Sequence, residues 1–184
     1  MIDGGCRYRR RVVAAVELHL DRAADRRIRN LWDAMEDSGV PSLRDLTHGK
    51  HRPHVSLVAA PSLDAVAVAH ALDGLDVAPP LRLDLDFVGL FRGRVLWLGP
   101  VPTTELIAHH AGVFDRLAAA GIDTFDEYRP GAWIPHCTLS MRVPHANMPA
   151  ALRLCLDALP IPATVSGAAV ADHIRDQYRQ LAPG

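Results

Sequence analysis

The order of apolar patterns repeats once along this chain of 184 residues, and that repeat limits the possible folds more than any other feature. Short apolar stretches of strand length alternate with longer stretches whose apolar residues recur every three or four positions, as on one face of a helix. The predicted strands are residues 11–18, 53–59, 79–90, 94–101, 133–141 and 163–171. The predicted helices are residues 21–39, 62–74, 103–121 and 147–159. Each half therefore has the order β-α-β-α-β, which indicates an internal duplication and predicts an α+β fold with pseudo-two-fold symmetry.

The predicted helices are bounded by residues that commonly begin and end helices. A side-chain oxygen at the first boundary can accept hydrogen bonds from free backbone N–H groups, and glycine accommodates the left-handed turn at the end. The predicted N-caps are Asp21, Ser62, Thr103 and Asn147, and the predicted terminating glycines are Gly39, Gly74 and Gly121. Two adjacent histidines, His109 and His110, fall on the third helix and are expected at a solvated edge.

Two of the predicted strands, one in each half, carry nearly the same short sequence. Residues 52–58 are RPHVSLV and residues 134–140 are IPHCTLS. Both place a proline, a histidine, one spacer, a hydroxyl residue and a leucine in that order. Side chains alternate between the two faces of a strand, so each histidine shares a face with its hydroxyl residue. If a pseudo-two-fold relates the halves, the two pairs converge on one groove.

These pairs, His54 with Ser56 and His136 with Thr138, are the candidate catalytic residues. Histidine titrates at about pH 6.5 when unperturbed, so one ring can be neutral while the other is protonated near neutrality. Such a pair can serve as general base and general acid in the cleavage of a phosphodiester. The hydroxyls can donate hydrogen bonds to the charged phosphoryl oxygens. No step needs a metal, and the near-symmetry of the motifs leaves open which histidine is the base. Cys137, between the second pair, is expected to point into the core.

The paired motifs, one in each half of a duplicated chain, resemble those of the 2H phosphoesterase superfamily, and in particular of the bacterial 2′-5′ RNA ligase family. GLFRGRVLWLGP (89–100) is similar to the strand that opens the second half in that family, and YRPGAWIPHCTLSM (128–141) to the approach to its second motif. The resemblance implies a bilobal fold with two antiparallel sheets around a central cleft and helices outside. It further implies metal-independent hydrolysis of 2′,3′-cyclic phosphates or 2′-5′ linkages, without a cofactor, and reversible 2′-5′ ligation by the same chemistry.

We expect one domain spanning residues 1–184, with lobes at about 11–90 and 91–171 and a C-terminal tail that packs back. The formal net charge of −1 argues against a protein that coats nucleic acid through bulk charge, so an RNA end or a cyclic nucleotide is the expected partner. The three cysteines form no CxxC motif, and neither a signal peptide nor an apolar run of membrane-spanning length is evident. A cytoplasmic monomer without a membrane or an obligate protein partner is therefore expected.

Substrate contacts outside the motifs are less well defined by the sequence. Tyr128 and Trp133 precede the second motif and could stack on a base, and Arg52 could reach a phosphate. The alternative for the two aromatics is core and loop packing. His51 and His54 form an H-x-x-H pattern, but no Cys or carboxylate lies nearby in sequence, which disfavours zinc. Two other functions stay open: a non-catalytic module that binds RNA or a nucleotide, and a cyclic phosphodiesterase for a small metabolite.

Overall fold

The computed structural model describes residues 14–45, 51–173 and 175–181, and its strands form two antiparallel sheets. The first sheet has the strand order β2-β1-β6-β7, and the second has the order β3-β4-β5. The strands are β1 (Ala14–Leu20), β2 (His54–Ala60), β3 (Leu85–Phe91), β4 (Val95–Pro100), β5 (Cys137–Ser140), β6 (Val165–Asp172) and β7 (Gln177–Leu181). The helices are α1 (Arg22–Asp37), α2 (Ala65–Ala71), α3 (Thr104–Ala119) and α4 (Met148–Ala158), with short 3₁₀ turns at Asp126–Tyr128 and His145–Asn147. The predicted α+β class with two antiparallel sheets is confirmed.

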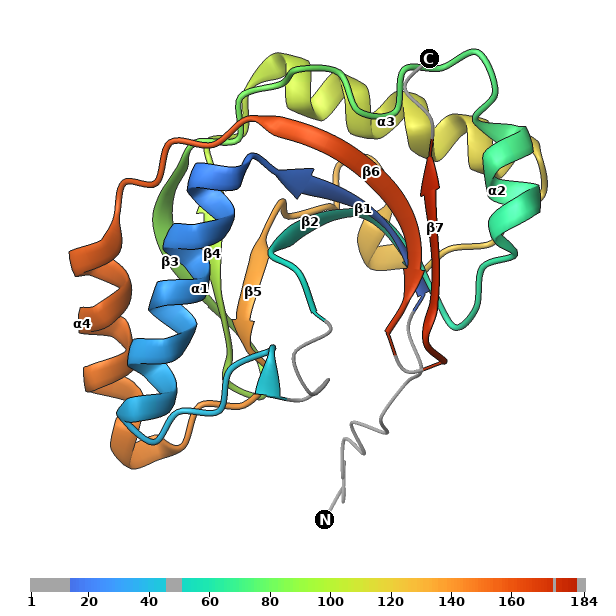
Figure 1. Ribbon diagram of the computed structural model, residues 1–184. Coiled ribbons are helices and arrows are strands. Elements are labelled where there is room, and N and C mark those ends of the chain that lie inside the picture. Colours follow the sequence, from blue (N-terminus) through green and yellow to red (C-terminus); the bar gives the residue numbers. More distant parts are fainter. Residues whose placement is uncertain (1–13, 46–50, 174, 182–184) are drawn as a thin grey trace.

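The helices lie outside the sheets, in two groups. Helices α1 and α4 lie side by side along one flank, near β3 and β4, whereas α2 and α3 lie at the opposite end, where α3 contacts β2 (Figure 1). Helix α1 shows why these segments pack as they do. Its apolar residues Ile28, Leu31, Trp32 and Met35 are all buried. Burying each such side chain contributes about 1.5–3 kcal/mol, which exceeds the helical propensity of the segment.

The two halves of the sequence exchange their third strands. Strand β3 pairs with β4 of the second half, and β6 pairs with β1 of the first half. In both sheets the strand that opens a half lies in the middle, flanked by its own second strand and by the third strand of the other half. The equivalent strand order in the two sheets is consistent with an internal duplication of the sequence. The expected lobes, 11–90 and 91–171, therefore do not coincide with the two sheets.

Several predicted boundaries need correction. Helix α2 begins later than predicted, and its N-cap is Asp64, whose carboxylate accepts from the N–H groups of Val66 and Ala67, rather than Ser62. Asn147 occupies its predicted position but makes no capping bond, because its amide donates to the Ser38 carbonyl at the end of α1. The caps at Asp21 and Thr103 are confirmed. The predicted strands at 79–90 and 133–141 shorten to β3 and β5, which leaves His136 just before its strand. Residues 11–13 lie outside the described residues.

The sequence patterns did not predict β7, although the C-terminal tail was expected to pack back. Residues 177–181 add an edge strand to β6, and only Leu181 is buried. A short polar edge strand discourages pairing with other chains. Within the described ranges, no helix is both long and apolar enough to span a bilayer.

Candidate active site

The two motifs come together because the edge strands β2 and β5 of the separate sheets run next to each other. The backbone N–H of His54 donates to the Cys137 sulfur, which joins the starts of the two strands. Farther along, the indole N–H of Trp133 donates to the Ser56 carbonyl over 3.0 Å. The amide of Phe125 donates to the Ala59 carbonyl over 2.8 Å. The last two bonds satisfy outward carbonyls of β2, which has no strand on that side among the described residues.

The proline in each motif has a local consequence for the histidine that follows it. His54 Nδ1 lies 2.8 Å from the Arg52 carbonyl oxygen, and His136 Nδ1 lies 2.7 Å from the Ile134 carbonyl oxygen. Both contacts span the intervening proline, whose fixed φ holds the segment extended. A carbonyl can only accept, so Nδ1 carries a proton in both rings. Nε2 is therefore the nitrogen left for chemistry in both histidines.

The side chain of His54 shares its sheet face with a buried carboxylate. In the register between β1 and β2, Glu17 lies opposite Ser56 and His19 lies opposite His54. Directly opposed residues project to the same face, so all four side chains occupy one surface. Glu17 is 2% exposed, and its Oε1 lies 3.4 Å from His54 Nε2. A charged carboxylate at this depth is stable only with positive charge beside it.

Glu17 is also the centre of a histidine cluster that the sequence patterns did not reveal. Its Oε1 accepts a hydrogen bond from His173 Nε2 over 2.8 Å, and its Oε2 lies 3.8 Å from His19 Nε2. Burial by itself would raise the pKa of Glu17, but the charge on His54 and the bond from His173 hold that pKa well below its usual range. The carboxylate is therefore ionised at neutral pH. His51 stacks on His173 with ring centroids 3.9 Å apart, and burial lowers the pKa of His51 to about 2.

The surroundings of His136 are apolar instead. The ring of Phe91 meets the His136 ring edge-on at 4.9 Å, and the Trp97 ring centroid lies 6.0 Å away. Burial lowers the pKa of His136, the hydrogen bond to the Ile134 carbonyl raises it by less, and His54 adds a smaller lowering effect. The two motif histidines are thus close enough to interact electrostatically. Thr138 lies opposite Trp97 in the pairing of β4 with β5 and shares its face.

An aromatic layer extends from His136 across the second sheet. The ring of Trp97 covers Gly89, and the ring of Phe87 covers Gly99, so a Cβ at either glycine would collide with an aromatic ring. Phe87 meets Trp97 at a near-perpendicular 78° and is 41% exposed. The sequence patterns did not single out these aromatics, although their alternation with glycine along FVGLFRGRVLWLG (87–99) was a visible signal.

The three residues predicted as further substrate contacts lie in different settings. Trp133 is 8% exposed and stacks on His110 at 3.9 Å, which favours the core-packing alternative for this residue. Tyr128 is half-buried, and its carbonyl accepts from His110 Nε2 over 3.0 Å. His110 is therefore buried rather than solvated as expected. Arg52 is exposed, and its guanidinium lies 5.8 Å from the centroid of the Tyr178 ring.

His51, His54 and His173 bring their ring nitrogens within 4.8 Å of one another, which is close enough to consider a metal. Zinc binds imidazole nitrogens at about 2.0–2.1 Å and lies near the plane of each ring. Here the His173 ring is inclined by only 29° to His51 and 26° to His54, so its face rather than its edge is turned toward both rings. A metal would require these rings to turn. The geometry therefore fits a hydrogen-bonded cluster better than a prepared metal centre.

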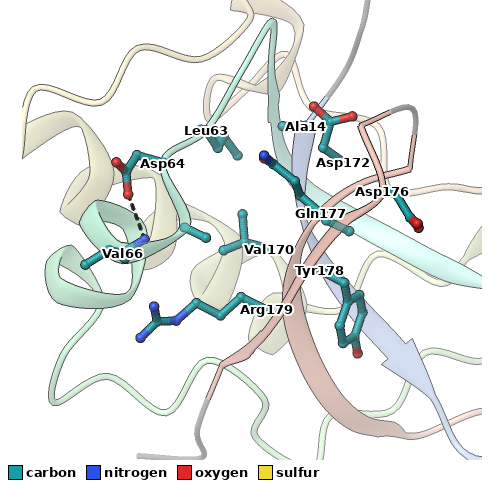
Figure 2. A pocket seen from close by; sticks show the side chains of 12 residues that line it. Ala14, Leu63, Asp64, Val66, Val170, Asp172, Asp176, Gln177, Tyr178 and Arg179 are labelled. Atoms are coloured by element: carbon teal, nitrogen blue, oxygen red, sulfur yellow. Dashed lines mark hydrogen bonds between the residues drawn. The ribbon is translucent and has the colours of Figure 1, made fainter.

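A separate cavity of about 520 Å³ lies between the start of α2 and the strands β6 and β7. Figure 2 shows Asp64, Arg179 and Tyr178 among its lining side chains. It contains neither of the two motifs, and Asp64 there already caps α2. The catalytic candidates lie elsewhere, along the line where β2 and β5 meet.

Two antiparallel sheets that bring a His-x-Ser and a His-x-Thr motif together are the features of a 2H phosphoesterase. The sequence profile of the 2′-5′ RNA ligase superfamily matches residues 20–177. The chain belongs to that superfamily, which supports enzymatic action on phosphate esters in general.

Solved structures share this fold at low sequence identity. A structure described as a phosphoesterase is 20% identical, with a TM-score of 0.56 over 91% of this chain and 92% of the other. Escherichia coli LigT complexed with 3′-AMP is 18% identical, with a TM-score of 0.58 over 93% of this chain and 94% of the other. LigT complexed with NADP⁺ is 19% identical, with a TM-score of 0.55 over 91% and 92%. No curated protein matches the chain.

Proposed function

We propose that this protein is a metal-independent phosphodiesterase that hydrolyses 2′,3′-cyclic phosphates on RNA ends or small nucleotides. The observation that carries the proposal is that β2 and β5, which belong to different sheets, run next to each other and bring the two motif histidines to one place. Two structural histidines would have no need to meet, each beside its own hydroxyl residue. Two catalytic histidines must meet, because both act on one phosphate.

In the proposed reaction, one histidine takes a proton from water as the water oxygen attacks phosphorus. The bond between phosphorus and one ribose oxygen breaks, and the other histidine donates its proton to that oxygen. The product is a nucleoside monophosphate with one free ribose hydroxyl. Ser56 and Thr138 donate hydrogen bonds to the non-bridging oxygens, where negative charge accumulates. If a ribose 5′-hydroxyl attacks phosphorus in place of water and the bond to the 3′-oxygen breaks, the same proton transfers form a 2′-5′ linkage.

A nucleotide is the favoured substrate class because of the aromatic layer beside His136. Phe87 is 41% exposed, and Phe91 is partly exposed on the same strand face. Bases stack on such rings with about 1–3 kcal/mol each. E. coli LigT, which has the same fold, has been crystallised with 3′-AMP and with ATP. A small non-nucleotide cyclic phosphate would leave these rings unused.

Replacing Ser56 or Thr138 by alanine is expected to lower kcat/KM about ten- to a hundredfold, because each change removes one hydrogen bond to a charged phosphoryl group. The measurement is steady-state kinetics on a 2′,3′-cyclic mononucleotide. Ser166→Ala is a matched control, since that hydroxyl bonds the Leu20 carbonyl away from the site. Equal losses in all three variants would indicate a general effect on folding rather than phosphate binding.

Chelation is expected to leave turnover unchanged, because the motifs supply acid, base and hydrogen-bond donors. The measurement is the rate of 2′,3′-cyclic mononucleotide hydrolysis after incubation with EDTA, compared with an untreated sample. A loss of activity that zinc restores would contradict the proposal and favour a metal at His51, His54 and His173. Binding of the nucleotide without any turnover would instead favour the non-catalytic module.

A further inference from the structure

We infer that Tyr178 and Arg52 form a second stacking subsite, on the first sheet, for the nucleoside next to the one that carries the reactive phosphate. The inference rests on the proposed function and narrows its substrate class from RNA ends and small nucleotides to RNA ends. Its basis is that Tyr178, a half-exposed aromatic residue on the edge strand β7, shares a sheet face with the first motif.

The pairing of the four strands places Tyr178 on the face that carries this motif. Glu17 of β1 lies opposite Ser56 of β2 and Ala169 of β6. Two residues further along β6, Ala171 lies opposite Tyr178 of β7. Directly opposed residues project to the same face, and so do residues two apart on one strand. Ser56, Glu17 and Tyr178 therefore share one face from the first edge of the sheet to the other.

The ring of Tyr178 extends from β7 toward β1. It stacks on the His19 ring with the centroids 5.9 Å apart and the planes inclined by 10°. On β6, which lies between these two strands, the residues on this face are Gly167, Ala169 and Ala171. Their side chains are no larger than a methyl group, so the ring can cross β6. His19 lies opposite His54, so the stack ends beside the first motif.

Arg52 approaches the same ring from a third segment, just before β2. Its guanidinium carbon lies 5.8 Å from the Tyr178 ring centroid, within the range of a cation–π contact. Despite these two neighbours, Tyr178 is 49% exposed. The other exposed residues of β7 are polar. A ring that is oriented by two neighbours and left half uncovered adds little to the core, but it offers a prepared surface on which a base can stack.

The two motifs lie between this ring and the aromatic layer of the second sheet. In strand order, Tyr178 is on β7 at one outer edge, Phe87 is on β3 at the other, and the motifs are where β2 and β5 meet. A cyclic mononucleotide has one base and can use only one of these surfaces. An RNA end supplies a second base, and Arg52 can pair with the phosphate that joins the two nucleosides. The formal net charge of −1 does not favour a longer track along the RNA backbone, so one additional nucleoside is the expected extent.

A binding comparison tests the subsite without depending on turnover. Titration calorimetry measures the Kd of a dinucleotide and of a mononucleotide, both ending in a 3′-monophosphate. The wild type should bind the dinucleotide about five- to a hundredfold more tightly, the usual contribution of one stacked base. Tyr178→Ala should remove most of this preference and leave the Kd of the mononucleotide unchanged. Tyr178→Phe keeps the ring and should retain the preference.

Arg179→Ala is the matched control, because Arg179 is the next residue along β7 and its side chain extends away from that of Tyr178 (Figure 2). It should leave both Kd values unchanged. A preference for the dinucleotide that survives Tyr178→Ala would overturn the inference. Equal weakening of both ligands by Tyr178→Ala would overturn it too, as would the same loss of preference in Arg179→Ala.

Kinetics on the corresponding 2′,3′-cyclic phosphates separate this inference from the proposed function. Tyr178→Ala should raise KM for the dinucleotide, with little change in kcat, and should leave both constants for the mononucleotide unchanged. Failure of the wild type to hydrolyse either substrate would overturn the proposed function itself. Hydrolysis of both substrates with equal kcat/KM by the wild type would leave the proposed function intact and overturn the second subsite.

Discussion

Replacing either His54 or His136 by alanine is expected to lower kcat/KM on a 2′,3′-cyclic nucleotide about a hundred- to ten-thousandfold, the usual contribution of a general acid or base. Both losses should be large because the two proton transfers belong to one transition state. The double variant should lose little more than either single variant, since residues that act as a unit are strongly non-additive. Nucleotide affinity should survive better than turnover, because the hydroxyls and the aromatic layer still bind.

The pH dependence gives a second measurement of the same pair. A neutral base and a protonated acid together produce a bell-shaped profile of kcat/KM. Burial lowers the pKa of His136, so if His136 is the base, it stays neutral to lower pH than an exposed histidine. The acid limb should therefore fall below pH 6.5, the ordinary histidine value. Near-wild-type turnover in either alanine variant would rule out the two-histidine mechanism, whatever the shape of the profile.

The motif geometry was predictable because it depends on local rules. Strand alternation places each histidine with its hydroxyl residue and turns Cys137 inward, where it is fully buried and its thiol pKa is raised to about 12. Alternation held for His136 even though its strand begins at Cys137, four residues later than predicted. The caps at Asp21 and Thr103 follow from short-range hydrogen bonds, and the sequence was sufficient to place them.

The Glu17 cluster was not predictable in the same way, because it depends on pairing between distant strands. His173 reaches Glu17 only because β6, from the end of the chain, pairs with β1 at its beginning. A signal was nonetheless present, since Glu17 and His19 alternate with apolar residues in the stretch AAVELHL. Polar residues with a period of two in a largely buried strand indicate one face that carries a polar site. The exchange of third strands was likewise beyond any local pattern.

Trp133→Ala is expected to lower the free energy of unfolding by about 3–5 kcal/mol, the usual loss when a buried tryptophan is truncated. Trp133 is 8% exposed, stacks on the buried His110, and donates its indole N–H to the Ser56 carbonyl. Truncation therefore creates a cavity and leaves the Ser56 carbonyl of β2 without its partner. The measurement is denaturant unfolding, with steady-state kinetics on the folded variant under native conditions.

Trp133→Phe is the matched control, because it keeps an aromatic ring against His110 and removes only the N–H group. Its expected loss is about 1–3 kcal/mol, the cost of leaving a buried acceptor unpaired. If Trp133 has a structural role, the free energy of unfolding should be highest for the wild type, lower for Trp133→Phe and lowest for Trp133→Ala. The KM of the folded molecules should change little. Base stacking by Trp133 predicts the reverse: a large rise in KM for the alanine variant, a small rise for phenylalanine, and an unfolding free energy close to that of the wild type. Because the indole ring lies against His110 and its N–H is already bonded to β2, the first pattern is the one we expect.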